Sequence, residues 1–274
     1  MKDRILILGK GFIGSRISEL LGYPTTSSKI WGLADALRLL KRRNCRILIN
    51  CVGSTGERNV DDCEKTPQKT LFLNSFLPII LAEACFRLKV KLVHISSGCI
   101  FHFDYRKNQP LSEDSTPDFF ELFYSRTKIY SEMALGSFLG IYPLLILRLR
   151  IPLDNKPHPK NILTKLIKVR RVIDIPNSIT YIPDFALALK HLIKINATGI
   201  YNVVNRGGLR YPELMEFYKR YHPEFEYEVI EPKELKTVRT NLILSTKRLE
   251  ATGFKARHIH KVLKECVEHY SQYL

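Results

Sequence analysis

The fold of this chain is decided by the stretch ILILGKGFIG at residues 5–14. Its four leading apolar residues predict a short buried strand, and three glycines spaced G-x-G-x-x-G open a stretch with helical spacing. Such glycines permit a tight turn, close approach of the backbone to a pyrophosphate, and close packing of helix on strand. The helix N-terminus adds amide donors for phosphates, whereas the alternative is an ordinary glycine turn. The residues predicted to bind a dinucleotide here are Gly9, Gly11, Phe12, Ile13 and Gly14.

Apolar runs of strand length alternate with longer stretches of helical spacing through the first two-thirds of the chain. The predicted strands cover residues 5–8, 46–52, 91–96, 144–150 and 199–205. The predicted helices cover residues 13–21, 33–43, 69–88, 120–139 and 184–195. Nearly continuous apolar strands are typical of strands buried on both faces. The alternation predicts an α/β fold with a Rossmann-type, doubly wound parallel sheet.

From residue 151 the chain becomes richer in proline and charge, which predicts a departure from the sheet. We expect residues 1–150 to form the cofactor-binding core, with residues 180–205 returning to the sheet. Residues 151–179 and 206–274 then form a smaller C-terminal substrate-binding lobe. Its predicted elements are helices at 211–221 and 258–273 and a strand at 226–230.

Composition limits the classes of function. The 274-residue chain has a formal net charge of +16, but its basic residues are dispersed and no nucleic-acid-binding motif accompanies them. The charge is therefore attributed to solubility or to attraction of anionic nucleotides, with nucleic-acid binding as the minor alternative. The six cysteines show no C-x-x-C pair and no histidine at metal spacing, so we expect no metal and a reducing, cytoplasmic setting. No run approaches the roughly 20 apolar residues of a membrane helix, so none is expected.

The choice of nicotinamide cofactor depends on the residues after the second strand. Residues 23–29 read YPTTSSK and contain no acid that would bind an adenosine ribose. The hydroxyl of Ser28 and the ammonium of Lys29 suit a 2′-phosphate, so NADPH is favoured over NADH. NADH stays possible because the segment from Gly14 to Thr25 is short for a full helix and strand. The further residues predicted to contact or support the cofactor are Cys51, Gly53, Asn74 and Arg150.

A catalytic set is predicted from Ser97, Tyr124 and Lys128. Tyr124 and Lys128 are four residues apart on a predicted helix, so they share a face, and the ammonium favours the phenolate form of tyrosine. Ser97 follows a predicted strand at the carboxyl edge of the sheet, where ligands bind in open α/β folds. The alternative is a surface pair and a turn residue. Cys99 would project near the same substrate carbonyl, and spacing alone leaves a proton-transfer role and a buried small side chain equally open.

Assembled in this order, the motifs resemble the extended short-chain dehydrogenase/reductase family. Within that family the chain is most similar to the nucleotide-rhamnose synthase/epimerase-reductases and to dTDP-4-dehydrorhamnose reductases. The resemblance covers nearly the whole chain. The segments that carry it are residues 9–14, 59–64, 98–101, 123–128, 147–152, 161–165 and 172–178.

The resemblance implies an enzyme that epimerises C3 and C5 of a UDP- or dTDP-4-keto-6-deoxy-glucose and then reduces C4 with NADPH to give the rhamnose nucleotide. It implies that Ser97, Tyr124 and Lys128 form the reductase triad, although relatives usually carry threonine at the position of Ser97. It also implies that Cys99 and Lys165 form the epimerase acid/base pair. The residues expected to bind substrate are Ser97, Gly98, Cys99, Asn161 and Lys165.

Two other functions stay open at this level. One is a reductase that acts only on substrate epimerised elsewhere, and the other is a non-catalytic NADP(H)-binding regulator on the same fold. The complete Ser-Tyr-Lys set counts against the regulator. The sequence leaves the oligomeric state open, and a homodimer through the two long mid-chain helices is one alternative, by analogy with the fold class.

Overall fold

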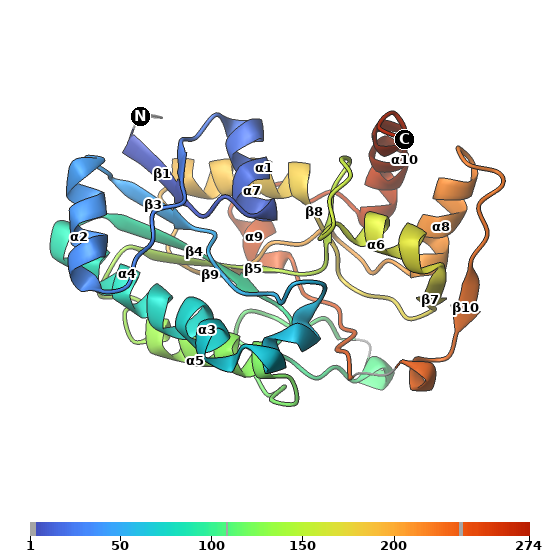
Figure 1. Ribbon diagram of the computed structural model, residues 1–274, viewed down its shortest axis with the longest axis horizontal. Helices are drawn as coiled ribbons and strands as arrows, with labels where there is room; N and C mark the ends of the chain where they lie inside the picture. The colour runs from blue at the N-terminus through green and yellow to red at the C-terminus, as the bar shows by residue number, and fades with distance from the viewer. Residues whose placement is uncertain (1–3, 108, 236–237) are drawn as a thin grey trace. The chain divides into compact units, whose positions relative to one another are not determined.

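The computed structural model describes residues 4–107, 109–235 and 238–274 (Figure 1). The described residues divide into two compact units. Unit 1 comprises the chain up to Ile100 together with Pro117–Arg148 and Leu189–Tyr201. Unit 2 comprises Phe101–Thr116, Leu149–Ala188 and Asn202–Leu274. The chain thus leaves unit 1 before residue 151, at Phe101, and returns to it twice.

Unit 1 is built on a six-stranded sheet with strand order β2-β1-β3-β4-β5-β9. Its strands are β1 (Ile5–Leu8), β2 (Thr25–Thr26), β3 (Ile47–Asn50), β4 (Lys91–Ser97), β5 (Leu144–Leu149) and β9 (Gly199–Asn202). β1 pairs in parallel with β2 and β3, and β3 pairs in parallel with β4. Because β1 has β2 on one side and β3 on the other, the strand order reverses at β1, which is where ligands bind in doubly wound sheets. The α/β prediction is confirmed.

Helices cover the sheet of unit 1 on both faces (Figure 1). They are α1 (Phe12–Leu21), α2 (Leu33–Arg42), the 3₁₀ turn η2 (Val60–Lys65), α3 (Pro67–Leu71), the π-helical turn η3 (Phe72–Phe76), α4 (Leu77–Leu88) and α5 (Phe123–Gly136). The side chains of Leu6, Leu48 and Leu92 form one apolar cluster with Leu40 of α2 and Leu81 of α4. Since every second residue of a strand faces the same side, this cluster marks the face that α2, α4 and α5 cover.

One helical stretch of unit 1 corrects an expectation from the sequence. Residues Pro67–Leu88 run through α3, η3 and α4 and are long and apolar enough, by length and composition, to cross a membrane. The expectation that no such run exists was therefore wrong. Leu77, Leu81 and Cys85 of this stretch are buried in the apolar cluster against the sheet. A core helix passes the same test of composition, so the finding is weak evidence for a membrane.

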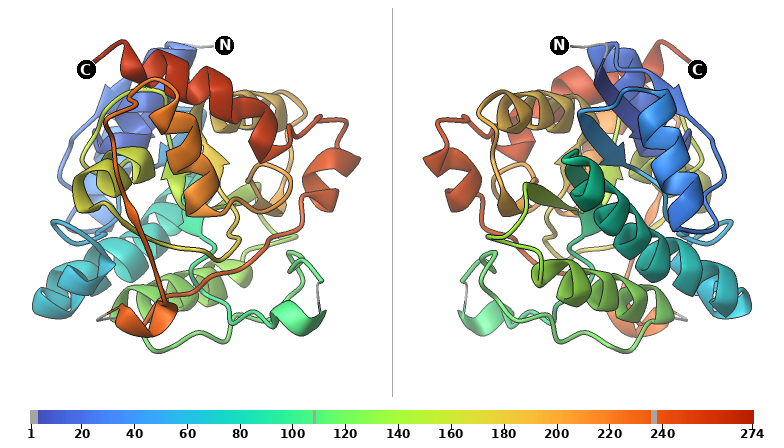
Figure 2. Two further views of the ribbon diagram at one scale, coloured as in Figure 1. Left: turned by 90° about the vertical axis from the view of Figure 1, so that its right-hand side faces the viewer. Right: turned by 90° about the vertical axis from the view of Figure 1, so that its left-hand side faces the viewer.

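Unit 2 has its own core. Its strands form two parallel pairs, β6 (Pro152–Leu153) with β8 (Thr180–Tyr181), and β7 (Arg171–Ile173) with β10 (Glu228–Ile230). Its other elements are η4 (Tyr105–Lys107), α6 (Ile162–Val169), α7 (Ile182–Lys194, whose last turns count with unit 1), α8 (Tyr211–Lys219), η5 (Pro232–Glu234), α9 (Lys247–Ala251) and α10 (Ile259–Ser271). α8 and α10 lie side by side over an apolar cluster that includes Met215 and Leu263 (Figure 2).

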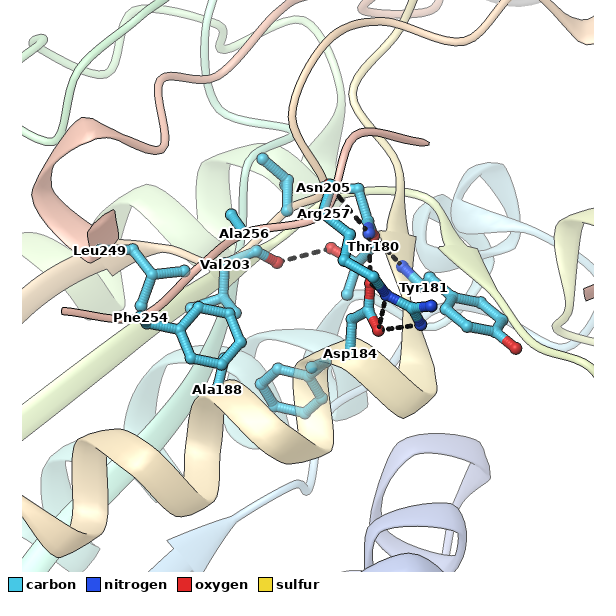
Figure 3. A pocket seen from close by; sticks show the side chains of 12 residues that line it. Thr180, Tyr181, Asp184, Ala188, Val203, Asn205, Leu249, Phe254, Ala256 and Arg257 are labelled. Atoms are coloured by element: carbon cyan, nitrogen blue, oxygen red, sulfur yellow. Dashed lines mark hydrogen bonds and ion pairs between the residues drawn. The ribbon is translucent and has the colours of Figure 1, made fainter. Parts of the chain in front are cut away.

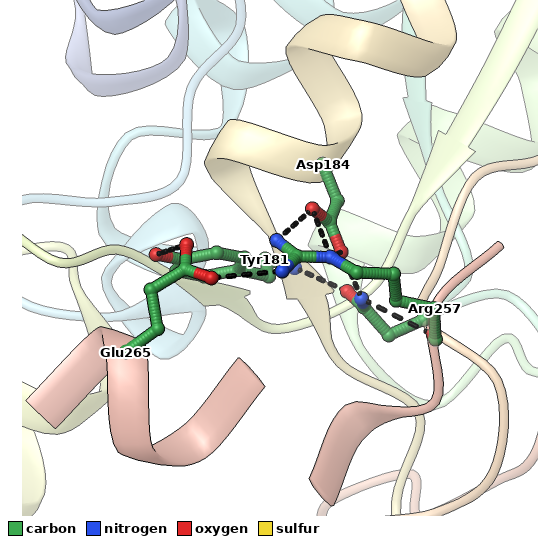
Figure 4. A network of polar contacts seen from close by, with 5 residues as sticks. Tyr181, Asp184, Arg257 and Glu265 are labelled. Carbon is green, nitrogen blue, oxygen red and sulfur yellow. Dashed lines mark hydrogen bonds and ion pairs between the residues drawn. The ribbon is translucent and has the colours of Figure 1, made fainter. Parts of the chain in front are cut away.

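A polar network ties the elements of unit 2 together (Figure 4). The Arg257 side chain binds Asp184 of α7 with both Nε and a terminal nitrogen, and donates to Glu265 of α10 at 2.8 Å. Tyr181 donates its hydroxyl to Glu265 at 3.0 Å, and Asn205 donates to Asp184 at 2.6 Å. Each acid in the network therefore has a cation and a neutral donor, as partly buried charges require.

Candidate active site

The glycine turn after β1 leaves room for a phosphate. Gly9 has a φ of +109°, in the left-handed region that favours glycine. A Cβ on Gly14 would lie 2.0 Å from the Gly9 carbonyl oxygen, whereas a Cβ on Gly11 would meet no described atom within 4 Å. α1 begins directly after Gly11, and this N-cap residue has no side chain that would fill the space in front of the helix. An open space in front of helical N–H groups fits the pyrophosphate of a dinucleotide.

The residues after β2 place hydroxyl groups next to this turn. The Gly9 amide donates to the Thr26 carbonyl oxygen at 2.9 Å, which ties the glycine turn to the end of β2. The hydroxyls of Thr26 and Ser28 are 2.8 Å apart, and the following Lys29 is exposed. β2 is only two residues long, which explains how helix and strand fit into the short segment after Gly14.

The loop after β3 is held by two buried asparagines. Asn50 accepts from the Val52 amide at 3.0 Å, and Asn74 accepts from the Ser54 amide at 2.7 Å. Asn74 also donates to the Ser54 carbonyl at 3.0 Å and to the hydroxyl of Thr127 in α5 at 3.1 Å. The π-helical turn η3 presents Asn74, and such turns are frequent at functional sites. Gly53 lies between the two clamped residues.

Gly53 brings this loop next to Lys128. A Cβ on Gly53 would lie 3.5 Å from Lys128 Nζ and 3.2 Å from Asn74 Oδ1. The preceding Cys51 lines the glycine turn, since its Cβ would lie 3.2 Å from a Cβ on Gly14. Burial raises the pKa of the Cys51 thiol to about 12, so the thiol stays protonated at neutral pH. The loop thus links the cofactor turn with the predicted catalytic lysine.

The turn after β4 is fixed against the start of α5. Ser97 ends β4 and is 6% exposed, and its Oγ accepts from the Cys99 amide at 3.1 Å. Ser125, in the first turn of α5, donates to the Cys99 carbonyl at 2.5 Å. Tyr124 is its neighbour on α5 and is 7% exposed. Unit 1 therefore brings Ser97, Gly98 and Cys99 next to the helix that carries Tyr124 and Lys128.

Lys128 is buried one turn along α5 from Tyr124 and is 4% exposed. Burial lowers the pKa of its ammonium to about 8, and the negative charge of Glu132 opposes this shift. The thiol groups of Cys51, Cys63 and Cys99 also oppose the effect of burial on the pKa of Lys128. Lys128 is therefore mostly an ammonium at pH 7 and loses its proton as the pH rises through about 8.

Sequence reasoning missed a buried ion pair behind Lys128. Glu132 of α5 and Arg148 of β5 are 4% and 2% exposed, and Arg148 Nε donates to Glu132 Oε2 at 2.9 Å. Ser96 of β4 donates to Glu132 Oε1 at 2.5 Å. A single arginine inside the apolar run of β5, and a glutamate four residues after Lys128, were the available signals.

A buried histidine was missed as well. His94 of β4 is fully buried, and its Nδ1 lies 3.1 Å from Asn50 Nδ2. Since the Asn50 amide nitrogen is a donor, Nδ1 accepts and the proton of the neutral ring lies on Nε2. Burial, and then the charge of Lys128, lower the pKa of His94 well below its usual value. His94 is thus a neutral acceptor that orients Asn50 and, through it, the loop at Val52.

The other predicted residues lie in unit 2. Lys165 is in α6 and half-buried, and burial, Lys160 and Arg239 lower the pKa of its ammonium, in that order. Asn161 caps α6, and its buried amide group binds backbone atoms of Asp154, Lys156 and Leu163. Both its donors and its acceptor are engaged within the protein. The structure thus gives Asn161 a role in starting the helix that carries Lys165, and its direct contact with substrate stays a prediction.

Arg150, also in unit 2, is 3% exposed and engaged within the protein. Its Nε donates to Asn177 Oδ1 at 3.1 Å, and a terminal nitrogen donates to the Thr240 carbonyl. Asn177 in turn accepts from the Leu242 amide and donates to Asn241. The segment around Asn177 is part of the sequence that resembles the family. Its contacts fix residues 240–242 in position. A contact of Arg150 with cofactor stays a prediction.

Figure 3 shows the residues around a cavity of unit 2, which is too small for a nucleotide. It has a volume of about 10 Å³ and lies between Thr180, Phe185, Leu249 and Phe254, next to the Asp184 and Arg257 pair. That is about the space of one water molecule. The polar groups beside it are already paired with one another, so the cavity is a packing feature.

Comparison with protein-family models identifies the family of this chain. The family model described as the RmlD substrate binding domain matches residues 4–212. The chain belongs to the RmlD substrate binding domain family. A relative from Arabidopsis thaliana, named bifunctional dTDP-4-dehydrorhamnose 3,5-epimerase/dTDP-4-dehydrorhamnose reductase, is 31% identical over 237 residues, covering 81% of this chain and 77% of the relative. A trifunctional UDP-glucose 4,6-dehydratase/UDP-4-keto-6-deoxy-D-glucose 3,5-epimerase/UDP-4-keto-L-rhamnose-reductase from the same organism is 29% identical, and the matched region spans 35% of its length.

Solved structures agree on the fold. The L780 UDP-rhamnose synthase from Acanthamoeba polyphaga mimivirus has a TM-score of 0.89 at 24% identity, covering 97% of this chain and 98% of that one. The dTDP-4-dehydrorhamnose reductase of Bacillus anthracis, solved in complex with NADP, has a TM-score of 0.82 at 20% identity, covering 99% of both chains. Both proteins thus share the overall fold of this chain.

Proposed function

We propose that the protein is an NADPH-dependent nucleotide-sugar enzyme that epimerises C3 and C5 of a UDP- or dTDP-4-keto-6-deoxy-glucose and reduces C4. The observation that carries the proposal is the buried Tyr124 and Lys128 pair on α5, next to the clamped Gly53 loop and the open glycine turn. Family membership supplies the substrate class, because named relatives act on 4-keto-rhamnose nucleotides.

The reductive half of the reaction is assigned to unit 1. NADPH, when bound, supplies the hydride for C4. The hydroxyls of Ser97 and Tyr124 hold the ketone oxygen, and Tyr124 gives it a proton. Lys128 supports that proton transfer as an ammonium, since a neighbouring positive charge lowers the free energy of the phenolate. Ser28 and Lys29 favour the 2′-phosphate of NADPH because no carboxylate stands between residues 23 and 29.

The epimerisation is assigned to Cys99 and Lys165. The protons on C3 and C5 flank the C4 carbonyl, so removal of either gives an enolate whose oxygen Ser97 and Tyr124 stabilise. Cys99 has a half-buried thiol after the fixed turn at Ser97. Lys165 has an ammonium whose pKa is lowered by burial, which suits proton exchange. A thiol and an amine supply the acid and the base that inversion needs.

The test is turnover of UDP- and dTDP-4-keto-6-deoxy-glucose, followed by NADPH oxidation and by deuterium uptake at C3 and C5 in heavy water. Tyr124→Phe should lose NADPH oxidation, and the exposed Tyr130→Phe on the same helix is its matched control. Cys99→Ser should lose deuterium uptake while still reducing substrate that is already epimerised. Wild-type protein that binds NADPH yet turns over neither nucleotide sugar would contradict the proposal.

A reductase without epimerase activity is the second candidate, because relatives named only dTDP-4-dehydrorhamnose reductase also match this chain. It predicts that wild-type protein reduces the epimerised 4-keto sugar but incorporates no deuterium into the unepimerised one. The same two assays therefore separate the candidates.

We also propose a cytoplasmic homodimer. All six cysteines are free thiols, as expected in a reducing compartment. A dimer through the mid-chain helices is supported by the exposed aromatic rings of Phe76, Phe86 and Tyr130 on η3, α4 and α5. Light scattering should give a mass of about twice 31.8 kDa, and a monomer would exclude the dimer.

A further inference from the structure

A carboxylate is paired with an arginine inside unit 1, where apolar side chains form the core. Glu132 accepts from Arg148 Nε at 2.9 and 3.2 Å and from Ser96 Oγ at 2.5 Å, and a terminal nitrogen of Arg148 lies 2.7 Å from Oε2. The side chains of Glu132 and Arg148 are 3% and 2% exposed. Replacing such a buried pair with apolar residues is often neutral or stabilising. Stability alone therefore does not explain why the pair is here.

The position of Glu132 on α5 offers an explanation. Residues four apart on a helix are neighbours on one face, so Glu132 follows Lys128 as Lys128 follows Tyr124. Arg148 comes from β5 and Ser96 from β4, so two strands of the sheet fix the carboxylate under α5. The Glu132 carboxylate is bound by side chains of the sheet, whereas Lys128 Nζ lies near the loop at Gly53.

The groups whose charges are coupled to that of Lys128 come from several elements of unit 1. They are Glu132 on α5, Cys63 on η2, Cys51 after β3, Cys99 after β4, and His94 within β4. His94 is neutral, and the Cys51 thiol stays protonated at neutral pH. Within the described part of the chain, Glu132 is thus the one carboxylate among the groups that act on Lys128. Without Glu132, no carboxylate among these groups would oppose the lowering of the Lys128 pKa by burial.

We propose that Glu132 is the counter-charge that keeps Lys128 an ammonium in the buried site, and that Arg148 and Ser96 hold the Glu132 carboxylate in its orientation. The inference rests on the proposed function and names three positioning residues for it. None of the three needs to touch substrate or cofactor. Arg148 fixes the position of the carboxylate, because it supplies an opposite charge and hydrogen bonds from Nε to both carboxylate oxygens.

The consequence is a change in the pH at which Lys128 loses its proton. With Glu132→Gln the ammonium is less favoured, so Lys128 should titrate at a pH at least about one unit lower than in wild type. Reduction of the 4-keto sugar should then fall at correspondingly lower pH and recover towards pH 6, where Lys128 is protonated in both proteins. A purely structural role would lower the rate at every pH and leave the position of the fall unchanged.

The experiment is NMR titration of lysine side-chain carbons in the whole protein, with Lys128 assigned by its absence in Lys128→Met. It needs no turnover, so it distinguishes failure of this inference from failure of the proposed function. Because Glu132→Gln leaves Arg148 unpaired and can impair folding, Glu132→Gln/Arg148→Met removes both charges together. Glu132→Asp, which keeps the charge, should restore most of the wild-type titration. Lys91, a buried lysine at the other end of β4, is the internal control and should titrate unchanged.

A shift of Lys128 to lower pH in both the single and the double variant, with Lys91 unmoved, would support the inference. An unshifted Lys128 in a folded double variant would overturn it, as would equal shifts of Lys128 and Lys91.

Discussion

Two buried lysines at opposite edges of the unit 1 sheet have the same shifted pKa but different surroundings. Lys91 begins β4 at the amino edge, and Lys128 lies by the loops at the carboxyl edge. Burial lowers the pKa of each to about 8. Lys91 donates to Asn196 Oδ1 at 2.8 Å and to the Ala197 carbonyl at 2.6 Å. Lys128 is surrounded instead by a glycine loop, three thiols and a carboxylate.

The difference teaches that a shifted pKa does not identify a catalytic lysine. Both groups that accept hydrogen bonds from Lys91 are parts of the protein itself, so Lys91 acts as a structural crosslink between β4 and the turn before β9. Lys128 is placed next to a predicted acid, Tyr124, and a backbone that leaves room for a cofactor. The two lysines differ in where they lie. Only Lys128 is at the carboxyl edge of the sheet, where doubly wound folds bind ligands.

The sharpest way to break this comparison is to remove each ammonium in turn. Lys128→Met should lower the rate of 4-keto-sugar reduction by about 10²- to 10⁴-fold, the usual contribution of acid–base groups. Lys91→Met should leave the rate per folded molecule within about twofold of wild type. Steady-state kinetics of both variants, with folded fractions from circular dichroism, decide the question. Equal losses in the two variants would mean that Lys128 is also only structural.

A second test adds a single methyl group at the carboxyl edge. Gly53→Ala places a Cβ about 3.5 Å from Lys128 Nζ and 3.2 Å from Asn74 Oδ1, in the space next to the loop. We expect a folded protein whose KM for NADPH rises about tenfold, equivalent to a loss of about 1.4 kcal/mol of binding free energy. Gly136→Ala at the end of α5, where a Cβ would meet no described atom within 4 Å, is the matched control. An unchanged KM in Gly53→Ala would separate the loop from the cofactor.

Much of the carboxyl edge could be predicted from the sequence, because its signals are local. The glycines at 9–14 and the Tyr124 and Lys128 spacing each lie within one element, so short-range patterns indicate them. The Glu132 and Arg148 pair joins a helix to a strand, and its meaning depends on burial that no spacing reveals. Asn74 was expected to support the site, but its contacts with Ser54 and Thr127 depend on a π-helical turn.

A third test uses the pH dependence of reduction. A lysine with a pKa near 8 is an ammonium below that pH and loses its proton above it, so activity should be present at pH 7 and fall as pH rises through about 8. At pH 9 about a tenth of Lys128 stays charged, which predicts a roughly tenfold lower rate. Lys128→Arg, which stays charged, should move the fall to higher pH. A profile that is flat between pH 7 and 9 in wild type would contradict the role of the ammonium.

The smallest effect is expected at the amino edge and concerns stability. Lys91→Met leaves Asn196 Oδ1 and the Ala197 carbonyl without their donor, which should lower the free energy of unfolding by about 1–3 kcal/mol. Because the pKa of Lys91 is lower in the folded than in the unfolded chain, wild-type Lys91 stabilises the fold increasingly as pH rises from about 8 to about 10.4. The stability difference between wild type and Lys91→Met should therefore grow over that range in urea unfolding. Lys128→Met should leave no such pair of acceptors without a donor, so its free energy of unfolding should fall by less. An equal fall in the two variants would contradict the contrast between the two edges.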